Sequence, residues 1–86
     1  MNLKDKKILI TGATGGIGHS LVKKFYNLGS NVLATGTNED KLKLLKEEFK
    51  NIKTKSFKLD QHSEIEKFID SCNLELGNID VLINNA

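Results

Sequence analysis

The stretch ILITGATGGIG, residues 8–18, places three consecutive aliphatic residues directly before a glycine-rich segment. A short, continuous apolar run is typical of a parallel strand that is buried on both faces of a sheet. Glycines after such a strand let the backbone approach a phosphate with no Cβ in the way, and a following helix offers free N–H groups and a positive dipole end. The stretch therefore predicts a strand, a phosphate-binding turn around Gly12, Gly16 and Gly18, and a helix N-terminus.

Outward from this stretch, helices and strands alternate. Apolar residues recur at helical spacing from Ile17 to Leu28, and Gly29 follows as a C-terminal cap. The remaining elements are expected as a strand over 31–35, a helix capped by Asn38, an edge strand over 54–59, a helix opened by the capping box of Ser63 and Glu66 and ending near Gly77, and a strand over 80–83.

This alternation, with its short connections, favours a parallel sheet with right-handed crossovers. We expect an α/β fold, the N-terminal half of a Rossmann-type doubly wound parallel sheet with strand order 3-2-1-4. In that order, the carboxyl ends of the first and fourth strands meet at the crevice where the strand order reverses, which is where such sheets bind ligands. Both the glycine-rich segment and the last residues of the sequence, VLINNA, fall there.

Composition excludes several classes of protein. The 86 residues carry a formal net charge of +2 from thirteen lysines and eleven acidic residues, with no arginine. Because the planar guanidinium group that suits phosphates and base edges is missing, no nucleic-acid partner is expected. No apolar run approaches the about 20 residues of a membrane span, and the polar start MNLKDKK resembles no signal peptide, so we expect a cytoplasmic protein without a membrane partner.

Two side chains that could take part in chemistry, those of Cys72 and His19, are interpreted as structural or solvent-facing residues or as lying beside a phosphate. Cys72 is the only cysteine, so it cannot form an internal disulfide, and we expect a small residue on a half-buried helix face. His19 follows the glycine loop in the first turn of the helix and is interpreted as facing solvent or lying beside a phosphate. No metal site is predicted.

Two motifs carry a resemblance to a known family. Residues 11–18, TGATGGIG, match T-G-x-x-x-G-x-G, and residues 84–86 match the start of N-N-A-G. On these motifs the chain resembles the short-chain dehydrogenase/reductase family over all 86 residues. The loop also fits T-G-x-x-G-x-x-G, which marks a longer, epimerase-like branch, whereas N-N-A indicates the shorter reductase branch. The phrase GTNEDKL after the second strand is most similar to 3-oxoacyl-[acyl-carrier-protein] reductases.

The resemblance implies a nicotinamide dinucleotide cofactor. Asn84 would steady the sheet, Asn85 and Ala86 would lie near the ribose and nicotinamide, and Asp60 would hydrogen-bond the adenine with Gln61 beside the ring. An alternative for Asp60 is a solvated residue that ends the third strand. The predicted cofactor contacts are Gly12, Ala13, Thr14, Gly15, Gly16, Ile17, Gly18, Thr37, Asp60, Gln61, Asn85 and Ala86.

The end of the second strand favours NADP over NAD. An NAD-selective site places an Asp or Glu at this corner, where the carboxylate binds the ribose hydroxyls and repels a 2′-phosphate. Here the corner reads TGTN over residues 35–38, and the first carboxylate is that of Glu39. The absence of arginine, and Gly15 at a position where many NADP enzymes carry a basic residue, limit the expected preference.

The family's catalytic Ser and its Tyr-x-x-x-Lys pair follow N-N-A-G and have no counterpart in this sequence. Tyr26 is followed four residues later by Ser30 instead of a lysine. We therefore expect residues 1–86 to be an NADP-binding half-domain, truncated before the catalytic and substrate-binding half and inactive alone. The intact enzyme would reduce a ketone in a small molecule or acyl-carrier thioester and form a homo-oligomer. Alternatives are a small nucleotide-binding protein without catalysis, and a helper chain that completes its sheet with a partner.

Overall fold

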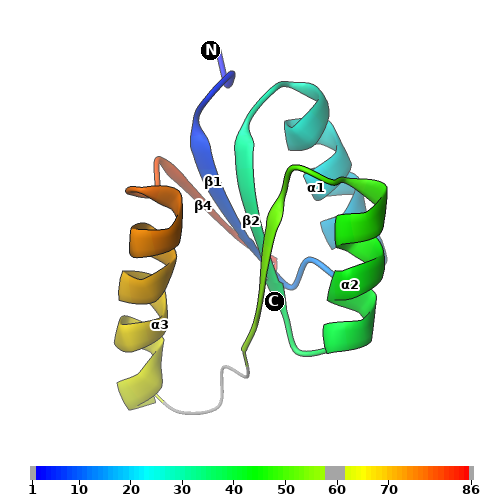
Figure 1. The fold of residues 1–86 in the computed structure, drawn as a ribbon. Coiled ribbons are helices and arrows are strands. Elements are labelled where there is room, and N and C mark those ends of the chain that lie inside the picture. The colour runs from blue at the N-terminus through cyan, green and yellow to red at the C-terminus, as the bar shows by residue number, and fades with distance from the viewer. Residues whose placement is uncertain (1, 58–61, 86) are drawn as a thin grey trace.

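The computed structural model describes residues 2–57 and 62–85. Strands and helices alternate as predicted: β1 (Lys7–Thr11), α1 (Gly16–Asn27), β2 (Asn31–Gly36), α2 (Glu39–Glu48), β3 (Lys53–Ser56), α3 (His62–Leu76) and β4 (Val81–Asn84). The strands form one parallel sheet in the order β3-β2-β1-β4, which confirms the predicted α/β fold and strand order. Helices α1 and α2 cover one face of the sheet, and α3 covers the other (Figure 1).

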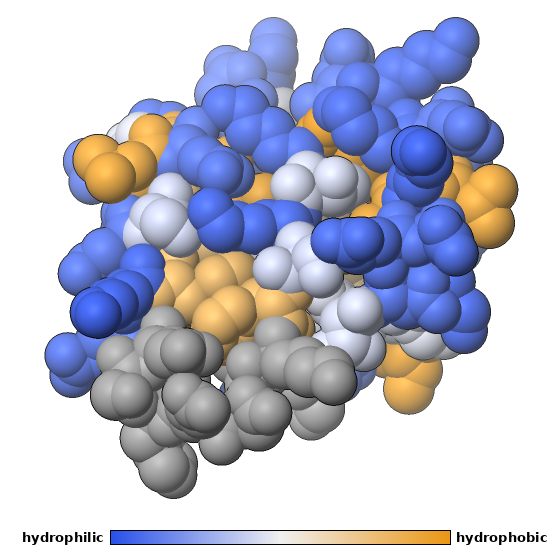
Figure 2. Space-filling model, turned by 60° about the horizontal axis from the view of Figure 1, so that its bottom comes forward, coloured by the Kyte–Doolittle hydropathy of each residue, from blue (hydrophilic) through white to orange (hydrophobic). Residues whose placement is uncertain are grey.

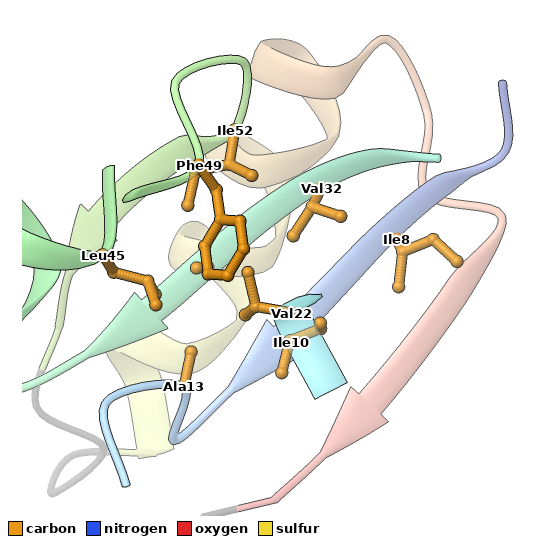
Figure 3. Close-up of a cluster of buried hydrophobic side chains, with 9 residues drawn as sticks. Ile8, Ile10, Ala13, Val22, Val32, Leu45, Phe49 and Ile52 are labelled. Carbon is orange, nitrogen blue, oxygen red and sulfur yellow. The ribbon is translucent and has the colours of Figure 1, made fainter. Parts of the chain in front are cut away.

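The main core lies between the sheet and helices α1 and α2. Because side chains alternate between the faces of a strand, Ile8 and Ile10 of β1 both point to this side. There they meet Val22 from α1 and Phe49, which directly follows α2, as Figure 3 shows. Ala13 of the glycine-rich loop joins the same cluster and is fully buried. The loop is thus anchored in the core from which the sheet is built.

A smaller core lies under α3. Leu9 and Leu33 of the two central strands contact Phe68, Cys72 and Leu76 of the helix. Cys72 is fully buried, more so than the half-buried position predicted for it. Burial raises the pKa of the Cys72 thiol, which outweighs the opposite effect of Lys55 nearby. Cys72 is therefore a core residue, held as an uncharged thiol.

The predicted helix ends are confirmed where side chains are described. Gly29 adopts φ +80° after α1 and donates its N–H to Tyr26 O at 3.1 Å. Gly77 adopts φ +78° after α3, a conformation that favours glycine. Asn38 caps α2, since its side-chain oxygen accepts the N–H of Lys41 at 3.0 Å.

Several boundaries differ from the sequence prediction: β2 runs to Gly36 instead of residue 35, and β4 covers Val81–Asn84 instead of 80–83. β3 covers residues 53–56 instead of 54–59, because its partner β2 ends at Gly36, which pairs with Ser56. Gly36 O still accepts the Phe57 N–H at 2.9 Å, and residues 58–61 lie outside the described residues. α3 begins at His62, one residue before the predicted cap Ser63. Within residues 2–57 and 62–85, no helix combines the length and apolar content that crossing a membrane requires.

Candidate nucleotide-binding site

The loop between β1 and α1 lies at the carboxyl end of the sheet, where the strand order reverses. A pocket of about 270 Å³ opens there, lined by Thr11, Gly12, Thr14, Thr35, Gly36, Thr37 and Phe57. Figure 2 looks toward this end of the molecule and shows an apolar patch beside residues of intermediate hydropathy. An apolar pocket rimmed by a few hydroxyl and backbone groups suits a ligand that has both a flat apolar part and a phosphate part.

Two glycines fix how closely the loop and α1 approach each other. Gly12 adopts φ +61°, a conformation that L side chains rarely take. A Cβ added at Gly18 would lie 2.4 Å from Gly12 O and 2.6 Å from Ala13 Cα, both of them backbone atoms. In contrast, a Cβ at Gly15 or Gly16 would meet nothing within 4 Å. Gly12 and Gly18 are therefore required for the packing of the loop against α1. Gly15 and Gly16 leave the backbone accessible to a ligand.

The N-terminus of α1 is left without the groups that satisfy other helix ends. Its N-cap residue, Gly15, makes no side-chain capping bond, and the first turn carries no acidic residue. In contrast, α2 begins with the Asn38 cap and carries Glu39 and Asp40 in its first turn. Because the first N–H groups of a helix have no intrahelical partner, those of α1 can bind an anion at the positive end of the helix dipole.

A hydrogen-bond network ties the loop to the end of β4. The Thr11 hydroxyl donates to Asn84 Oδ1 at 2.9 Å and accepts the Asn85 N–H at 3.1 Å. Asn85 Nδ2 donates in turn to Gly12 O at 3.1 Å. These bonds join two segments more than seventy residues apart in sequence at the same edge of the sheet. Thr11, which sequence reasoning did not count among the site residues, therefore links the glycine loop to the second motif.

Replacing Thr11 by valine keeps the shape of the side chain but removes the hydroxyl. The Asn85 N–H and Asn84 Oδ1 would then lose a partner each, so we expect the free energy of unfolding to fall by about 1–3 kcal/mol. Thr11→Ser keeps the hydroxyl and should recover most of the loss. Chemical denaturation of both variants measures this difference, and equal unfolding midpoints would show that the network contributes nothing.

The end of β2 lies beside the loop. Ala13 donates its N–H to Thr35 O at 2.9 Å, and a Cβ added at Gly36 would lie 3.0 Å from Thr14 Cγ2. The exposed Thr37 follows at the rim of the pocket. The end of β2, which would meet a ribose, is thus in direct contact with the glycine loop, which would bind phosphates.

Most of the predicted site residues gather at this edge. The structure brings together Gly12, Ala13, Thr14, Gly15, Gly16, Ile17, Gly18, Thr37 and Asn85. The side chain of Ala13 points into the core, whereas that of Ile17 is 71% exposed beside the loop. Asp60, Gln61 and Ala86 lie outside the described residues. No group of three potential metal ligands occurs within residues 2–57 and 62–85.

A larger groove of about 580 Å³ runs between α2 and β3, but its chemistry is less suited to a ligand. Two of its lysines are already engaged: Lys46 with Ile52 O, and Lys55 with Glu75 at 3.1 Å. It also lies on the far side of α2 from the glycine loop. The smaller pocket at the switch point is therefore the better candidate site.

The parallel sheet in the order β3-β2-β1-β4, with helices on both faces, defines a protein of Rossmann-like fold. The sequence model of a family described as short chain dehydrogenase matches residues 6–86, and the chain belongs to this family. It is 36% identical over 80 residues to the NADP-dependent 3-hydroxy acid dehydrogenase YdfG of Escherichia coli. The matched segment covers 92% of this chain and 32% of that protein. It is 34% identical over 87 residues to the 3-oxoacyl-[acyl-carrier-protein] reductase FabG of Rickettsia bellii, covering 100% of this chain and 34% of that one.

Solved structures agree with the sequence comparison. A short chain dehydrogenase from Bacillus anthracis superimposes with a TM-score of 0.87 at 32% identity, over 100% of this chain and 36% of that one. This chain thus spans about a third of the length of the relatives it matches.

Proposed function

We propose that residues 1–86 form the N-terminal, cofactor-binding half-domain of an NADP-dependent oxidoreductase that reduces a ketone to an alcohol. The observation that carries this proposal is the close contact of Gly18 with Gly12 below an uncapped helix N-terminus, at the switch point of the sheet. The N–H groups of residues 16–18 would bind the pyrophosphate, and Asn85 would lie near the nicotinamide ribose. When bound, the cofactor supplies the hydride.

The choice of NADP is supported by the end of β2. Thr37 places a hydroxyl at the rim of the pocket, and no carboxylate precedes Glu39. Glu39 is the first residue of α2 and directly follows the corner of residues 35–38 that would meet the ribose. The name of one relative, an NADP-dependent dehydrogenase, points the same way.

The substrate class is proposed from the relatives. The names of two of them, a 3-hydroxy acid dehydrogenase and a 3-oxoacyl-[acyl-carrier-protein] reductase, specify oxygen at position 3 of an acid or acyl chain. We propose a 3-oxoacyl thioester or a similar small molecule, reduced in the cytoplasm by a homo-oligomer of the intact protein. Ketone reduction requires a proton donor and a group that polarises the carbonyl. Both would come from outside residues 1–86, since the family's Tyr-x-x-x-Lys pair has no match within them.

The test is an assay of the intact protein with NADPH and an acetoacetyl thioester, followed by nicotinamide absorbance. We expect NADPH to be consumed faster than NADH, and the product, a 3-hydroxybutyryl thioester, to be oxidised back when it is supplied with NADP⁺. A failure of both substrates, with NADPH still binding saturably, would favour a nucleotide-binding protein without catalysis. Faster turnover with NADH would overturn the proposed cofactor.

A further inference from the structure

The proposed preference for NADP raises the question of which cation meets the 2′-phosphate. This group carries close to two negative charges at neutral pH, and its recognition usually needs a positively charged side chain. The chain contains no arginine, and Gly15 has no side chain. Within residues 1–86, such a cation would therefore be a lysine or a histidine near the loop.

A hollow of about 180 Å³ lies between the glycine loop, α1 and α2. Its lining residues are Ala13, Thr14, His19, Lys41, Leu44, Leu45 and Glu48. Lys41 is the only lysine among these lining residues, which include Ala13 and Thr14 of the glycine loop. Its main chain is fixed at the start of α2, because its N–H is bound by the Asn38 side chain. Lys41 thus shares this hollow with Thr14, which also lines the pocket that contains Thr37.

The charged groups near Lys41 leave it as the side chain that can attract a 2′-phosphate. The His19 ring is already paired, since its Nε2 lies 2.8 Å from Glu48 Oε1. Glu39 and Asp40 line another hollow together with Thr37, and both would repel a phosphate. With Lys41 absent, the surroundings of a 2′-phosphate would be dominated by carboxylates.

We infer that Lys41 is a specificity-determining residue, whose ammonium group pairs with the 2′-phosphate of NADP from the α2 side of the glycine loop. This inference rests on the proposed function and names the side chain through which the preference arises. The lysine takes the place of a basic residue in the loop itself, where Gly15 provides none.

The experiment titrates the intact protein with 2′,5′-ADP and with 5′-ADP, which lacks the 2′-phosphate. Lys41→Gln should weaken binding of 2′,5′-ADP about tenfold and leave 5′-ADP unchanged. The matched control is Lys43→Gln, because Lys43 is equally part of α2 but lines the groove on the β3 side. It removes the same net charge, so it reports the general electrostatic attraction, and we expect it to change neither affinity by more than about twofold.

The outcomes separate the inference from the proposed function. If the unsubstituted protein prefers 2′,5′-ADP and Lys41→Gln keeps that preference, or if both lysine variants lose it equally, the role of Lys41 is wrong and the cofactor proposal survives. If the unsubstituted protein binds 5′-ADP as tightly as 2′,5′-ADP, both the NADP proposal and the role of Lys41 are overturned. A loss confined to Lys41→Gln and to 2′,5′-ADP supports the inference.

Discussion

Replacing Gly18 by alanine is expected to remove cofactor binding and to lower the free energy of unfolding by about 3 kcal/mol. The added Cβ would lie 2.4 Å from Gly12 O, and neither side of this contact is free to move. Gly12 O is held by Asn85 Nδ2 at 3.1 Å, and Ala13 is anchored by its N–H bond to Thr35 O and by its buried side chain. To relieve this steric clash, the loop and the first turn of α1 would have to move apart. The N–H groups that would bind the phosphates would then no longer point to one place.

The matched control is Gly16→Ala in the same loop. A Cβ at Gly16 meets nothing within 4 Å, and alanine is a better helix former than glycine by about 1 kcal/mol. This variant should melt at the same temperature as the unsubstituted protein or higher. Thermal unfolding of both variants, with NADPH titration of each, measures the contrast. Equal stability of Gly18→Ala and Gly16→Ala would contradict the close packing of the loop against α1.

Replacing Ile10 by alanine is expected to have the second large effect. Ile10 is fully buried, and Figure 3 shows its side chain near those of Val22 and of Ala13, which belongs to the glycine loop. Removing three carbons from such a site costs about 2–5 kcal/mol, since the lost burial is joined by the cavity left behind. This is a large part of the about 5–15 kcal/mol that stabilises a typical domain.

A control of the same size is Leu74→Ala. It also removes three carbons, but Leu74 lies on α3 and is 85% exposed. We expect a change within about 0.5 kcal/mol for this variant. Urea denaturation of the intact protein compares the two. If Ile10→Ala unfolds at the same urea concentration as Leu74→Ala, the core under the loop is not as tightly packed as the structure has it.

The order of the elements could be predicted from the sequence because each carries a local signal. The apolar run of residues 8–10 followed by glycines, the Asn38 cap and the turns at Gly29 and Gly77 are all decided by residues within a few positions of each other. The strand order followed from general rules of parallel sheets applied to this alternation. The position of the glycine loop at the switch point is therefore a consequence of local pattern and topology.

Contacts between distant residues had no such signal. His19, interpreted as solvent-facing or beside a phosphate, is 42% exposed and also pairs with Glu48, 29 positions away, while its ring lies 5.6 Å from that of Phe49. The edge strand predicted over 54–59 carried no signal for a contact with α3. In the structure Lys53 and Lys55 both bind Glu75 of α3, the first through the carbonyl and the second through the carboxylate. Such pairs depend on how helices pack across the sheet, which periodicity does not encode.

The Thr11 network shows the same limit within the site. Sequence comparison placed Thr11 in one motif and Asn84 and Asn85 in another, but hydrogen bonds between them exist only because β1 and β4 are neighbours in register. Thr11 pairs with Asn84 at the end of both strands. The hydroxyl is therefore in reach of both asparagines once the sheet has formed.

Cofactor binding is tested most directly by titrating the intact protein with NADPH and NADH and following nicotinamide fluorescence, with Gly18→Ala as the background. The glycine loop, the uncapped α1 N-terminus and the β2 corner together predict saturable binding, tighter for NADPH than for NADH, that disappears in Gly18→Ala. Saturable binding that persists unchanged in Gly18→Ala, tighter binding of NADH, or no binding of either cofactor would contradict an NADP site at the switch point of this sheet.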